Sequence, residues 1–139
     1  IFIFNTKGEM LLQQRAFSKY HTPGLWTNTC CSHPRHEESL EDATARRLKE
    51  EMGMSCEIKE AFHFTYKADV SQGLIEHEID HVFIGITDDT PIINTDEVAS
   101  WKYDTMENIR EDIAANPQNY TAWFKIAFEE VLKHFNKQN

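Results

Sequence analysis

The octapeptide TNTCCSHP, residues 27–34, places two adjacent thiols next to a hydroxyl and an imidazole. A structural disulfide, a metal site, and a reactive thiol that attacks or carries a proton all use these groups. A disulfide framework is disfavoured, because the chain has three cysteines and adjacent cysteines do not easily reach disulfide geometry. A metal site or a reactive thiol in a reducing compartment is the better interpretation, and we expect a cytoplasmic protein.

Side-chain alternation separates the two thiols if this segment is the end of a strand. Successive side chains of a strand point to opposite faces, so Cys31 and His33 would share one face and Cys30 and Ser32 the other. Cys31 is therefore the better candidate for chemistry, because it lies beside the imidazole. Ordinary burial as small apolar residues is the alternative for both cysteines, and we favour it for Cys30.

A second polar pattern interrupts the apolar run LIEHEIDHVFIGI, residues 74–86. Strand alternation places Glu76 and Glu78 on one face and His77 on the other. Two carboxylates on a core-facing side need a cation, a metal or a raised pKa, whereas an edge strand with a wet face would need none of these. We favour the metal or acid–base interpretation, with His33 as a third ligand of the type that Mn²⁺, Zn²⁺ or Mg²⁺ accepts.

The charged run RRLKEE, residues 46–51, has an ordinary explanation as the solvated face of a helix. Arg47 and Glu51 lie one turn apart and would share that face. Arg15 and Lys19 have an equally ordinary explanation, because basic residues near a turn are common. These residues carry no chemistry on this pattern alone.

Composition limits the class of protein. The chain has 139 residues, 40% of them hydrophobic, which fits a single domain over residues 1–139 with one core. A net charge of −9 argues against a nucleic-acid groove but allows a small phosphorylated ligand, which needs only a few cations. Neither a membrane span of ~18 apolar residues nor a signal peptide is visible. The chain begins with Ile1 inside an apparent strand, so we expect an N-terminal segment to be missing.

Periodicity and turn residues predict the elements that position these groups. Ser39 with Asp42 is typical of a helix start and Gly53 of a helix stop. The order of elements predicts an α/β or α+β fold with a mixed sheet. The predicted strands are 1–5, 10–15, 25–31, 61–68, 74–86 and 98–104, and the predicted helices are 39–52, 105–116 and a C-terminal helix from residue 120.

The segment SHPRHEESLEDATARRLKEEMGM, residues 32–54, resembles the Nudix box: a glycine, five residues, Glu, seven residues, then Arg-Glu-apolar-x-Glu-Glu-x-Gly-apolar. Ser32 replaces the glycine and Arg47 replaces the first glutamate of the second part. With WTNTCCSHP upstream and a tyrosine and Glu-x-Glu downstream, nearly the whole chain resembles type I isopentenyl-diphosphate isomerases of the Nudix superfamily. The residues in register are Glu38, Arg46, Leu48, Glu50, Glu51, Gly53 and Met54.

The resemblance implies an α/β (α+β) Nudix fold, a mixed β-sheet sandwiched by helices. It implies the isomerisation of isopentenyl diphosphate to dimethylallyl diphosphate in isoprenoid biosynthesis, by protonation and deprotonation through a tertiary carbocation. Cys31 and Glu78 are the implied catalytic residues, and Tyr66 is implied to assist Glu78. The implied partner is a small allylic or homoallylic diphosphate, with no nucleic acid or membrane, and the expected state is a monomer or weak dimer.

The resemblance also implies two divalent metals and a diphosphate site. His33, Glu76 and Glu78 correspond to ligands of a catalytic metal, Mn²⁺, Mg²⁺ or Zn²⁺, which in the family takes two further histidines from upstream of the first strand. Glu51, with the Cys31 carbonyl, corresponds to the site of a Mg²⁺ held against the diphosphate. The implied substrate contacts are Arg15, Lys19, Ser32, Arg47 and Trp123, the last over the reacting carbons.

Two alternatives remain beside the isomerase. One is a Nudix hydrolase of a nucleoside diphosphate derivative, against which stand Arg47, the replaced glycine and the TNTCCSHP motif. The other is a non-catalytic module that binds a diphosphate on the same fold. The presence of Cys31, Glu78, Tyr66 and Trp123 argues against the second.

Overall fold

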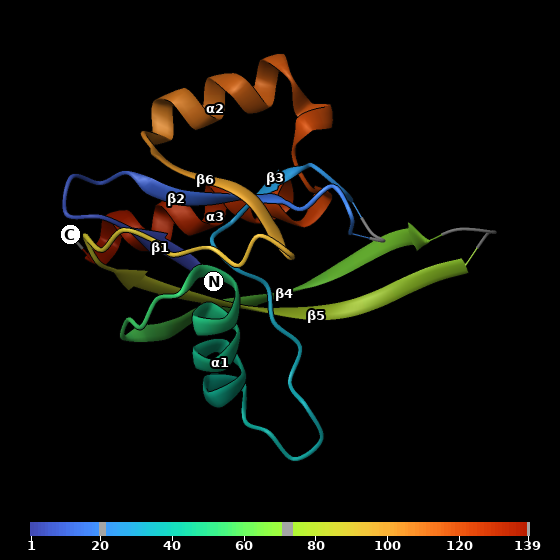
Figure 1. The fold of residues 1–139 in the computed structure, drawn as a ribbon. Coiled ribbons are helices and arrows are strands. Elements are labelled where there is room, and N and C mark those ends of the chain that lie inside the picture. Colours follow the sequence, from blue (N-terminus) through green and yellow to red (C-terminus); the bar gives the residue numbers. More distant parts are fainter. Residues whose placement is uncertain (20–21, 71–73, 139) are drawn as a thin grey trace.

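The computed structural model describes residues 1–19, 22–70 and 74–138, and the side chains of residues 66–70, 74–78 and 137–138 lie outside that description. Three α-helices and six strands follow one another along the chain (Figure 1). The strands are β1 (Phe2–Phe4), β2 (Met10–Arg15), β3 (Trp26–Thr27), β4 (Ile58–Val70), β5 (Leu74–Ile86) and β6 (Val98–Asp104). The helices are α1 (Leu40–Met52), α2 (Met106–Ala115) and α3 (Ala122–Gln138), with a short 3₁₀ turn, η1 (Pro117–Asn119), between the last two.

The sheet is mixed, as the order of elements predicts. Strand β2 pairs antiparallel with β1, β3 and β6, and β1 pairs in parallel with β5. Since β6 follows β2 over nearly its full length, β1 and β3 share the other edge of β2. Strand β5 then continues antiparallel into β4, which gives the order β3-β2-β1-β5-β4.

The long hairpin of β4 and β5 extends beyond the rest of the sheet (Figure 1). Its ladder has a bulge between Glu60 and Phe62, after which the pairing is regular to the hairpin end. In this register the backbone of Tyr66 lies opposite that of Glu78. The side chains of Tyr66, Glu76 and Glu78, all predicted site residues, lie outside the described part of the chain.

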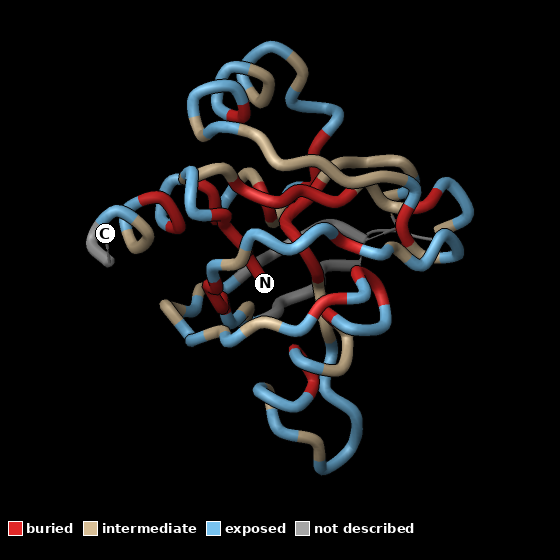
Figure 2. Tube along the Cα trace, turned by 60° about the vertical axis from the view of Figure 1, so that its left-hand side comes forward, coloured by how far each residue is buried: buried red, intermediate tan, exposed pale blue. Residues whose placement is uncertain are grey.

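Helices cover both faces of the sheet because the strands near the N-terminus carry apolar side chains on both of their faces. Phe2 and Phe4 contact the stripe of α3, whereas Ile1 and Ile3 contact α1. The first core joins Met10, Leu12, Val82, Ile84, Ile109, Phe124, Ala127, Phe128 and Val131; the second joins Leu11, Leu48, Met52, Met54 and Val98. These buried residues run through the centre of the molecule (Figure 2). The predicted sandwich is therefore confirmed.

Helix α1 begins and ends as its sequence predicts. The Ser39 Oγ accepts a hydrogen bond from the Asp42 backbone N–H at 3.1 Å, which satisfies one of the free donors of the first turn. Gly53 ends the helix in the left-handed region, at φ 62°, and its N–H donates to the Lys49 carbonyl. A side chain at Gly53 would also collide with the Ile92 carbonyl, 2.4 Å from where its Cβ would lie.

Two predictions about local structure are wrong. The third strand covers only Trp26–Thr27 and not residues 25–31, so strand alternation does not place Cys31 and His33 on one face. The charged run of α1 is not simply a solvated face, because Glu51 is buried and Arg47 is half-buried. Both errors fall where long-range side-chain contacts override local pattern. In the described part of the chain, no helix is long and apolar enough to cross a membrane.

Candidate active site

Buried polar side chains hold the segment that follows β3, since its backbone has no strand partner. Asn28 is 3% exposed and its Nδ2 donates to the carbonyls of Ile1 and Cys30, at 3.0 and 2.8 Å. The Thr29 hydroxyl donates to the Leu11 carbonyl at 2.7 Å and accepts from the Ile3 N–H at 2.9 Å. These bonds replace a β-ladder and fix the backbone on either side of the two thiols.

The two adjacent cysteines have different environments. Cys30 is fully buried, and its thiol donates to the Oε1 of Glu51 at 3.1 Å. Cys31 is half-buried, and its Sγ lies 3.8 Å from the Oδ1 of Asn28. Cys30 therefore belongs to the core, as predicted, and Cys31 is the thiol that a small molecule could reach.

Both thiols are protonated at neutral pH. Burial raises the pKa of Cys31 above its ordinary value of 9.0; the charge of Glu51 raises it further, and the charge of Arg15 lowers it. Burial, with the charge of Glu51, raises the pKa of Cys30 still further. A thiolate is the form that acts as nucleophile or metal ligand, so a protonated Cys31 is better suited to carry a proton.

Glu51 begins a chain of ionic contacts across the site. Its Oε2 accepts from Arg47 at 2.5 Å, and Arg47 also donates to Glu97 at 2.7 Å and to Glu50 at 2.9 Å. Lys19 reaches Glu97 at 3.4 Å. Two of the predicted diphosphate contacts, Arg47 and Lys19, therefore converge on one carboxylate that lies just before β6.

Gln13 extends this network into the sheet. Its side chain is 1% exposed, and its Nε2 donates to the Thr29 carbonyl at 2.8 Å and to the Oε1 of Glu51 at 3.3 Å. Glu51 thus has partners on both carboxylate oxygens although it is only 4% exposed. The contacts fix the orientation of this carboxylate next to the cysteine segment.

Arg15 and Trp123 form a second part of the site. The Arg15 guanidinium lies 5.7 Å from the centre of the Trp123 ring, within the range of a cation–π contact. Arg15 is the last residue of β2 and Trp123 lies in the first turn of α3. Since the Arg15 charge also acts on the Cys31 thiol, these three side chains belong to one region.

Glu38 and Arg46, both in register with the Nudix box, tie the loop before α1 to the helix. Arg46 donates to the two carboxylate oxygens of Glu38 from Nε and Nη2, each at 2.9 Å, and its Nη1 donates to Glu50 at 2.9 Å. Its Nη2 also reaches the His33 carbonyl at 3.4 Å. The contacts connect the backbone after Cys31 to α1.

We expect this clamp to make stability depend on pH. The hydrogen bond from Arg46, with that from the Arg35 N–H, lowers the pKa of Glu38 from 4.5 to about 2. Because the folded-state pKa is depressed, the stabilisation is complete above the unfolded pKa and is lost as pH falls toward 2. The melting temperature of Glu38→Gln should therefore lie below that of the wild type at pH 6, and the difference should disappear near pH 2.

Thermal unfolding followed by circular dichroism between about pH 2 and pH 6 measures this difference. Glu37→Gln is the matched control, because the Glu37 side chain is 86% exposed and, among the ion pairs of the described residues, takes part only in a 3.8 Å contact with His36. A Glu38→Gln deficit that stayed constant with pH would contradict the assignment.

The chain matches a family model and proteins of known name over most of its length. The NUDIX domain model matches residues 1–124. The isopentenyl-diphosphate Delta-isomerase of Serratia proteamaculans is 49% identical over 131 residues, which cover 94% of this chain and 73% of that protein. The isopentenyl-diphosphate Delta-isomerase 2 of Photorhabdus laumondii is 53% identical over 125 residues, 90% of this chain and 71% of that protein.

The chain belongs to the isopentenyl-diphosphate Delta-isomerase family of Nudix proteins. Solved structures confirm the Nudix fold. The MutT protein of Methanosarcina mazei Go1 superposes with a TM-score of 0.76 at 21% identity, over 99% of this chain and 91% of that one. A MutT Nudix hydrolase from Burkholderia pseudomallei gives 0.71 at 20% identity, over 94% and 95% of the two chains.

Within this isomerase-family chain, the predicted site residues fall into three groups. Glu51, Arg47 and Lys19 are linked through Glu97, and Arg15 contacts Trp123. Cys31 follows Cys30, whose thiol donates to Glu51, and it is affected by the charges of Glu51 and Arg15. Ser32 is half-buried and His33 is exposed on the loop that follows Cys31. The side chains of Glu76, Glu78 and Tyr66 are not described, so the predicted metal set of His33, Glu76 and Glu78 stays a prediction.

Three residues that complete the site were missed from the sequence. Asn28 lies inside the TNTCCSHP motif, and nothing in the sequence indicated that its side chain would be buried. Gln13 follows two apolar residues, Leu11 and Leu12, in β2, and a polar residue buried in such a strand indicates a specific partner. Glu97 is fifty residues from Arg47, and no local pattern links the two.

Glu51 is the buried carboxylate of the site that could help to hold a cation. Magnesium prefers oxygen ligands, and the Cys30 thiol that donates to Glu51 also lies 3.7 Å from the Cys31 carbonyl. Both Glu51 oxygens already accept hydrogen bonds, from Cys30 and Gln13 at Oε1 and from Arg47 at Oε2. A cation at Glu51 would therefore have to replace one of these contacts.

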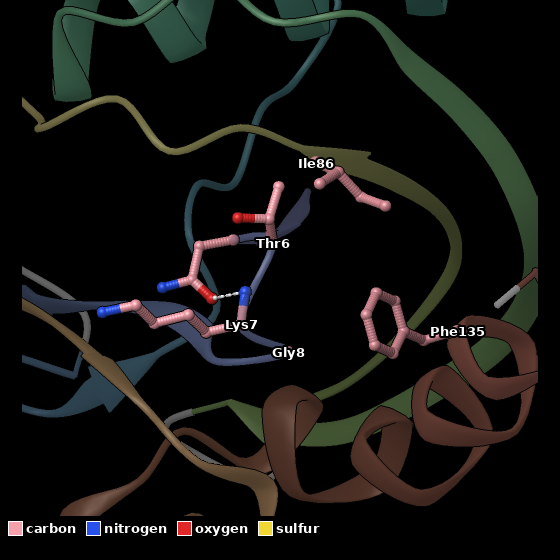
Figure 3. Close-up of a pocket in the computed structure, with 6 residues that line it drawn as sticks. Thr6, Lys7, Gly8, Ile86 and Phe135 are labelled. Atoms are coloured by element: carbon pink, nitrogen blue, oxygen red, sulfur yellow. Dashed lines mark hydrogen bonds between the residues drawn. The ribbon is translucent and has the colours of Figure 1, made fainter.

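A hollow of about 360 Å³ lies elsewhere on the molecule (Figure 3). It is at the β1–β2 turn beside α3, before the start of β2, whereas Arg15 lies at the other end of that strand. The Lys7 N–H donates to the Oδ1 of Asn5 at its edge, at 3.1 Å. Its lining residues are Asn5, Thr6, Lys7, Gly8, Ile86 and Phe135, none of which was predicted as a site residue.

Proposed function

We propose that this chain isomerises isopentenyl diphosphate to dimethylallyl diphosphate. The observation that carries the proposal is the half-buried thiol of Cys31, next in the chain to Cys30, whose thiol donates to Glu51. Burial raises the pKa of the Cys31 thiol. The names of relatives that are 49–53% identical support it independently. The groups of TNTCCSHP could serve as a nucleophile, a metal ligand or a proton carrier. A thiol with a raised pKa is better suited to carry a proton than to play either of the other two roles.

The proposed reaction adds a proton to one end of the alkene and removes another from the allylic carbon. An unactivated alkene is a very weak base, so the acid must be well placed in a site that excludes water. We assign the two proton carriers to Cys31 and Glu78, with Tyr66 assisting Glu78. Tyr66 and Glu78 are direct partners in the β4–β5 register, which supports their pairing.

The tertiary carbocation between the two proton transfers needs stabilisation without a nucleophile that would trap it. An indole face provides that, worth up to ~2 kcal/mol when desolvated. Trp123 already has a cation, the Arg15 guanidinium, within cation–π range of its ring. We therefore assign Trp123 to the reacting carbons and Arg15 to the neighbouring diphosphate.

The diphosphate is proposed to bind as a handle that positions the alkene. Arg47, Lys19 and Arg15 supply positive charge, and Ser32 a hydroxyl. Arg47 stands where the Nudix box has a glutamate, which replaces a metal-binding carboxylate by a guanidinium suited to phosphate oxygens. In the free protein Glu97 pairs with both Arg47 and Lys19, so a diphosphate would compete with this carboxylate for the two cations.

We assign a Mg²⁺ that neutralises the diphosphate to Glu51 and the Cys31 carbonyl. A second divalent metal, Mn²⁺, Mg²⁺ or Zn²⁺, is assigned to His33, Glu76 and Glu78. Such a metal would increase the acidity of a carboxylic acid that it contacts. The Nudix domain match supports divalent metal use in general terms.

Removing the Arg47 guanidinium should weaken substrate binding more than turnover. Arg47→Gln is expected to raise the KM for isopentenyl diphosphate by about 10–100-fold, because each hydrogen bond from a charged donor contributes about 1.5–3 kcal/mol. Steady-state kinetics with a coupled assay for dimethylallyl diphosphate measures this. Arg110→Gln is the matched control, since Arg110 pairs with Glu129 between α2 and α3 and should leave KM unchanged. Equal KM values for the two variants would remove Arg47 from the diphosphate site.

The runner-up is a Nudix hydrolase of a nucleoside diphosphate derivative, which the Nudix fold alone would allow. Incubation of the protein and Mg²⁺ with isopentenyl diphosphate, and separately with nucleoside diphosphate derivatives, distinguishes the two. The isomerase forms dimethylallyl diphosphate and releases no phosphate. Cleavage of a nucleotide derivative without isomerisation would decide for the hydrolase. If the protein catalysed neither reaction, the result would favour a binding module.

A further inference from the structure

Three potential metal ligands lie together on the β4–β5 hairpin, outside the proposed active site. Glu60, His63 and His81 each offer one ligand atom, and these atoms all lie within 4.8 Å of one another. The Nδ1 of His81 is 3.4 Å from the Oε2 of Glu60, and the two imidazole rings are 5.6 Å apart between centres. All three residues are exposed, so an ion could enter from solvent without a change of fold.

The β-bulge creates this cluster. His63 and His81 are direct partners across the ladder and therefore share a face. In a regular strand Glu60, three residues before His63, would point to the other face. The extra residue at the bulge changes the register, so Glu60 pairs with Phe83 and joins the face of His81.

The spacing is close to that of a tetrahedral metal site. Ligand bonds of 2.0–2.2 Å imply a separation of roughly 3.3 Å between ligand atoms, which the His81–Glu60 pair already has. His63 needs only a side-chain adjustment, and it is exposed enough to make one. Zn²⁺ accepts both imidazole and carboxylate, whereas Mg²⁺ and Ca²⁺ prefer oxygen ligands alone, so the two imidazoles favour Zn²⁺.

The cluster is separate from the proposed catalytic residues. Phe62 and Phe64 pack against the core under α3, whereas His63, between them, is exposed on the opposite face of the hairpin. None of the three ligands belongs to the residues assigned above to the diphosphate or to proton transfer. Only two ladder pairs, Phe64–Asp80 and Thr65–Ile79, lie between His63–His81 and Tyr66–Glu78.

We propose that Glu60, His63 and His81 bind one Zn²⁺ ion, with water completing the coordination. The ion joins β4 to β5 and stabilises the hairpin that carries Tyr66 and Glu78. A metal that binds only the folded protein raises its melting temperature in proportion to ln(1 + [Zn²⁺]/Kd). The double variant His63→Gln/His81→Gln removes two of the three ligands at exposed positions and should fold normally.

Equilibrium dialysis of the metal-free full chain against Zn²⁺, in excess Mg²⁺ to occupy sites with oxygen ligands, tests the proposal. We expect the wild type to bind one Zn²⁺ more than His63→Gln/His81→Gln. The matched control is His134→Gln, because His134 also lies near a glutamate, Glu130 at 3.5 Å, and is absent from the three-ligand cluster found among the described residues. This variant should bind as much zinc as the wild type.

Thermal unfolding with and without Zn²⁺ provides the second readout. A saturating excess should raise the melting temperature of the wild type and of His134→Gln by about 5 °C or more, and that of the double variant by less. Equal zinc stoichiometry in wild type and double variant would overturn the proposal. So would an equal zinc-induced shift of melting temperature in the two proteins.

Discussion

Replacing Cys31 with alanine is expected to lower the turnover of isopentenyl diphosphate by about 1,000-fold or more while leaving the fold intact. The thiol is half-buried, and its polar contact with Asn28 is long, at 3.8 Å, so its removal costs little stability. It supplies a proton carrier that neither Cys30 nor water can replace, because Cys30 is fully buried and bonded to Glu51. Turnover under saturating substrate and Mg²⁺, with circular dichroism as a check of folding, measures the effect.

Cys31→Ser refines this test. A serine hydroxyl is a weaker acid than a thiol, so this variant should be nearly as inactive although it keeps a polar group in place. Cys56→Ala is the matched control, since the Cys56 thiol donates to the Ile86 carbonyl at 3.5 Å and takes no part in the hydrogen bonds described above for Cys31 and Glu51. Near-normal turnover of Cys31→Ala would remove the thiol from the mechanism.

Replacing Glu78 with glutamine is expected to abolish both turnover and the binding of one divalent metal. An amide neither carries the proton nor ligates a hard cation as strongly as a carboxylate does. Loss of a general acid or base alone lowers the rate by about 100–10,000-fold, and loss of the metal adds to this. Metal content by atomic absorption and turnover are measured on the same sample.

Asp80→Asn is the matched control for Glu78→Gln. Asp80 lies two residues further along β5, opposite Phe64, and the same change from carboxylate to amide occurs there. We expect metal content and turnover to remain near those of the wild type. Full metal content in Glu78→Gln would contradict its assignment as a ligand, and full turnover would contradict its assignment as a proton carrier.

Local sequence signals were sufficient for the helices. Ser39 and Gly53 bound α1 because a capping side chain and a left-handed glycine act within one turn of the helix. The C-terminal stripe that begins at Phe124 is buried against the sheet because three- and four-residue spacing sets one face of a helix. Such signals need no knowledge of the rest of the chain.

The cysteine segment required more than local pattern. Its alternation suggested a strand, but Asn28 and Thr29 satisfy the backbone through side-chain hydrogen bonds to distant carbonyls. The side of the molecule that Cys31 faces therefore depends on contacts between segments about twenty to thirty residues apart. The burial of Cys30 in the core was nevertheless predicted correctly, although the strand alternation used to separate it from Cys31 was wrong.

The charged network was the least predictable part of the site. Arg47 was placed by resemblance, but its partner Glu97 lies in a loop with no motif. The bulge that brings Glu60 beside His81 has the same character, since it depends on the register between two strands. In both cases the sequence supplies the residue types, and only the fold brings them together.

The central claim is that one site adds a proton to the substrate and removes another without cutting the diphosphate. Proton and phosphorus NMR of isopentenyl diphosphate with the protein and Mg²⁺ in D₂O tests it most directly. The account predicts dimethylallyl diphosphate that carries deuterium from solvent, with the diphosphate intact. Release of phosphate, or isomerisation in which no solvent deuterium enters the product, would contradict it.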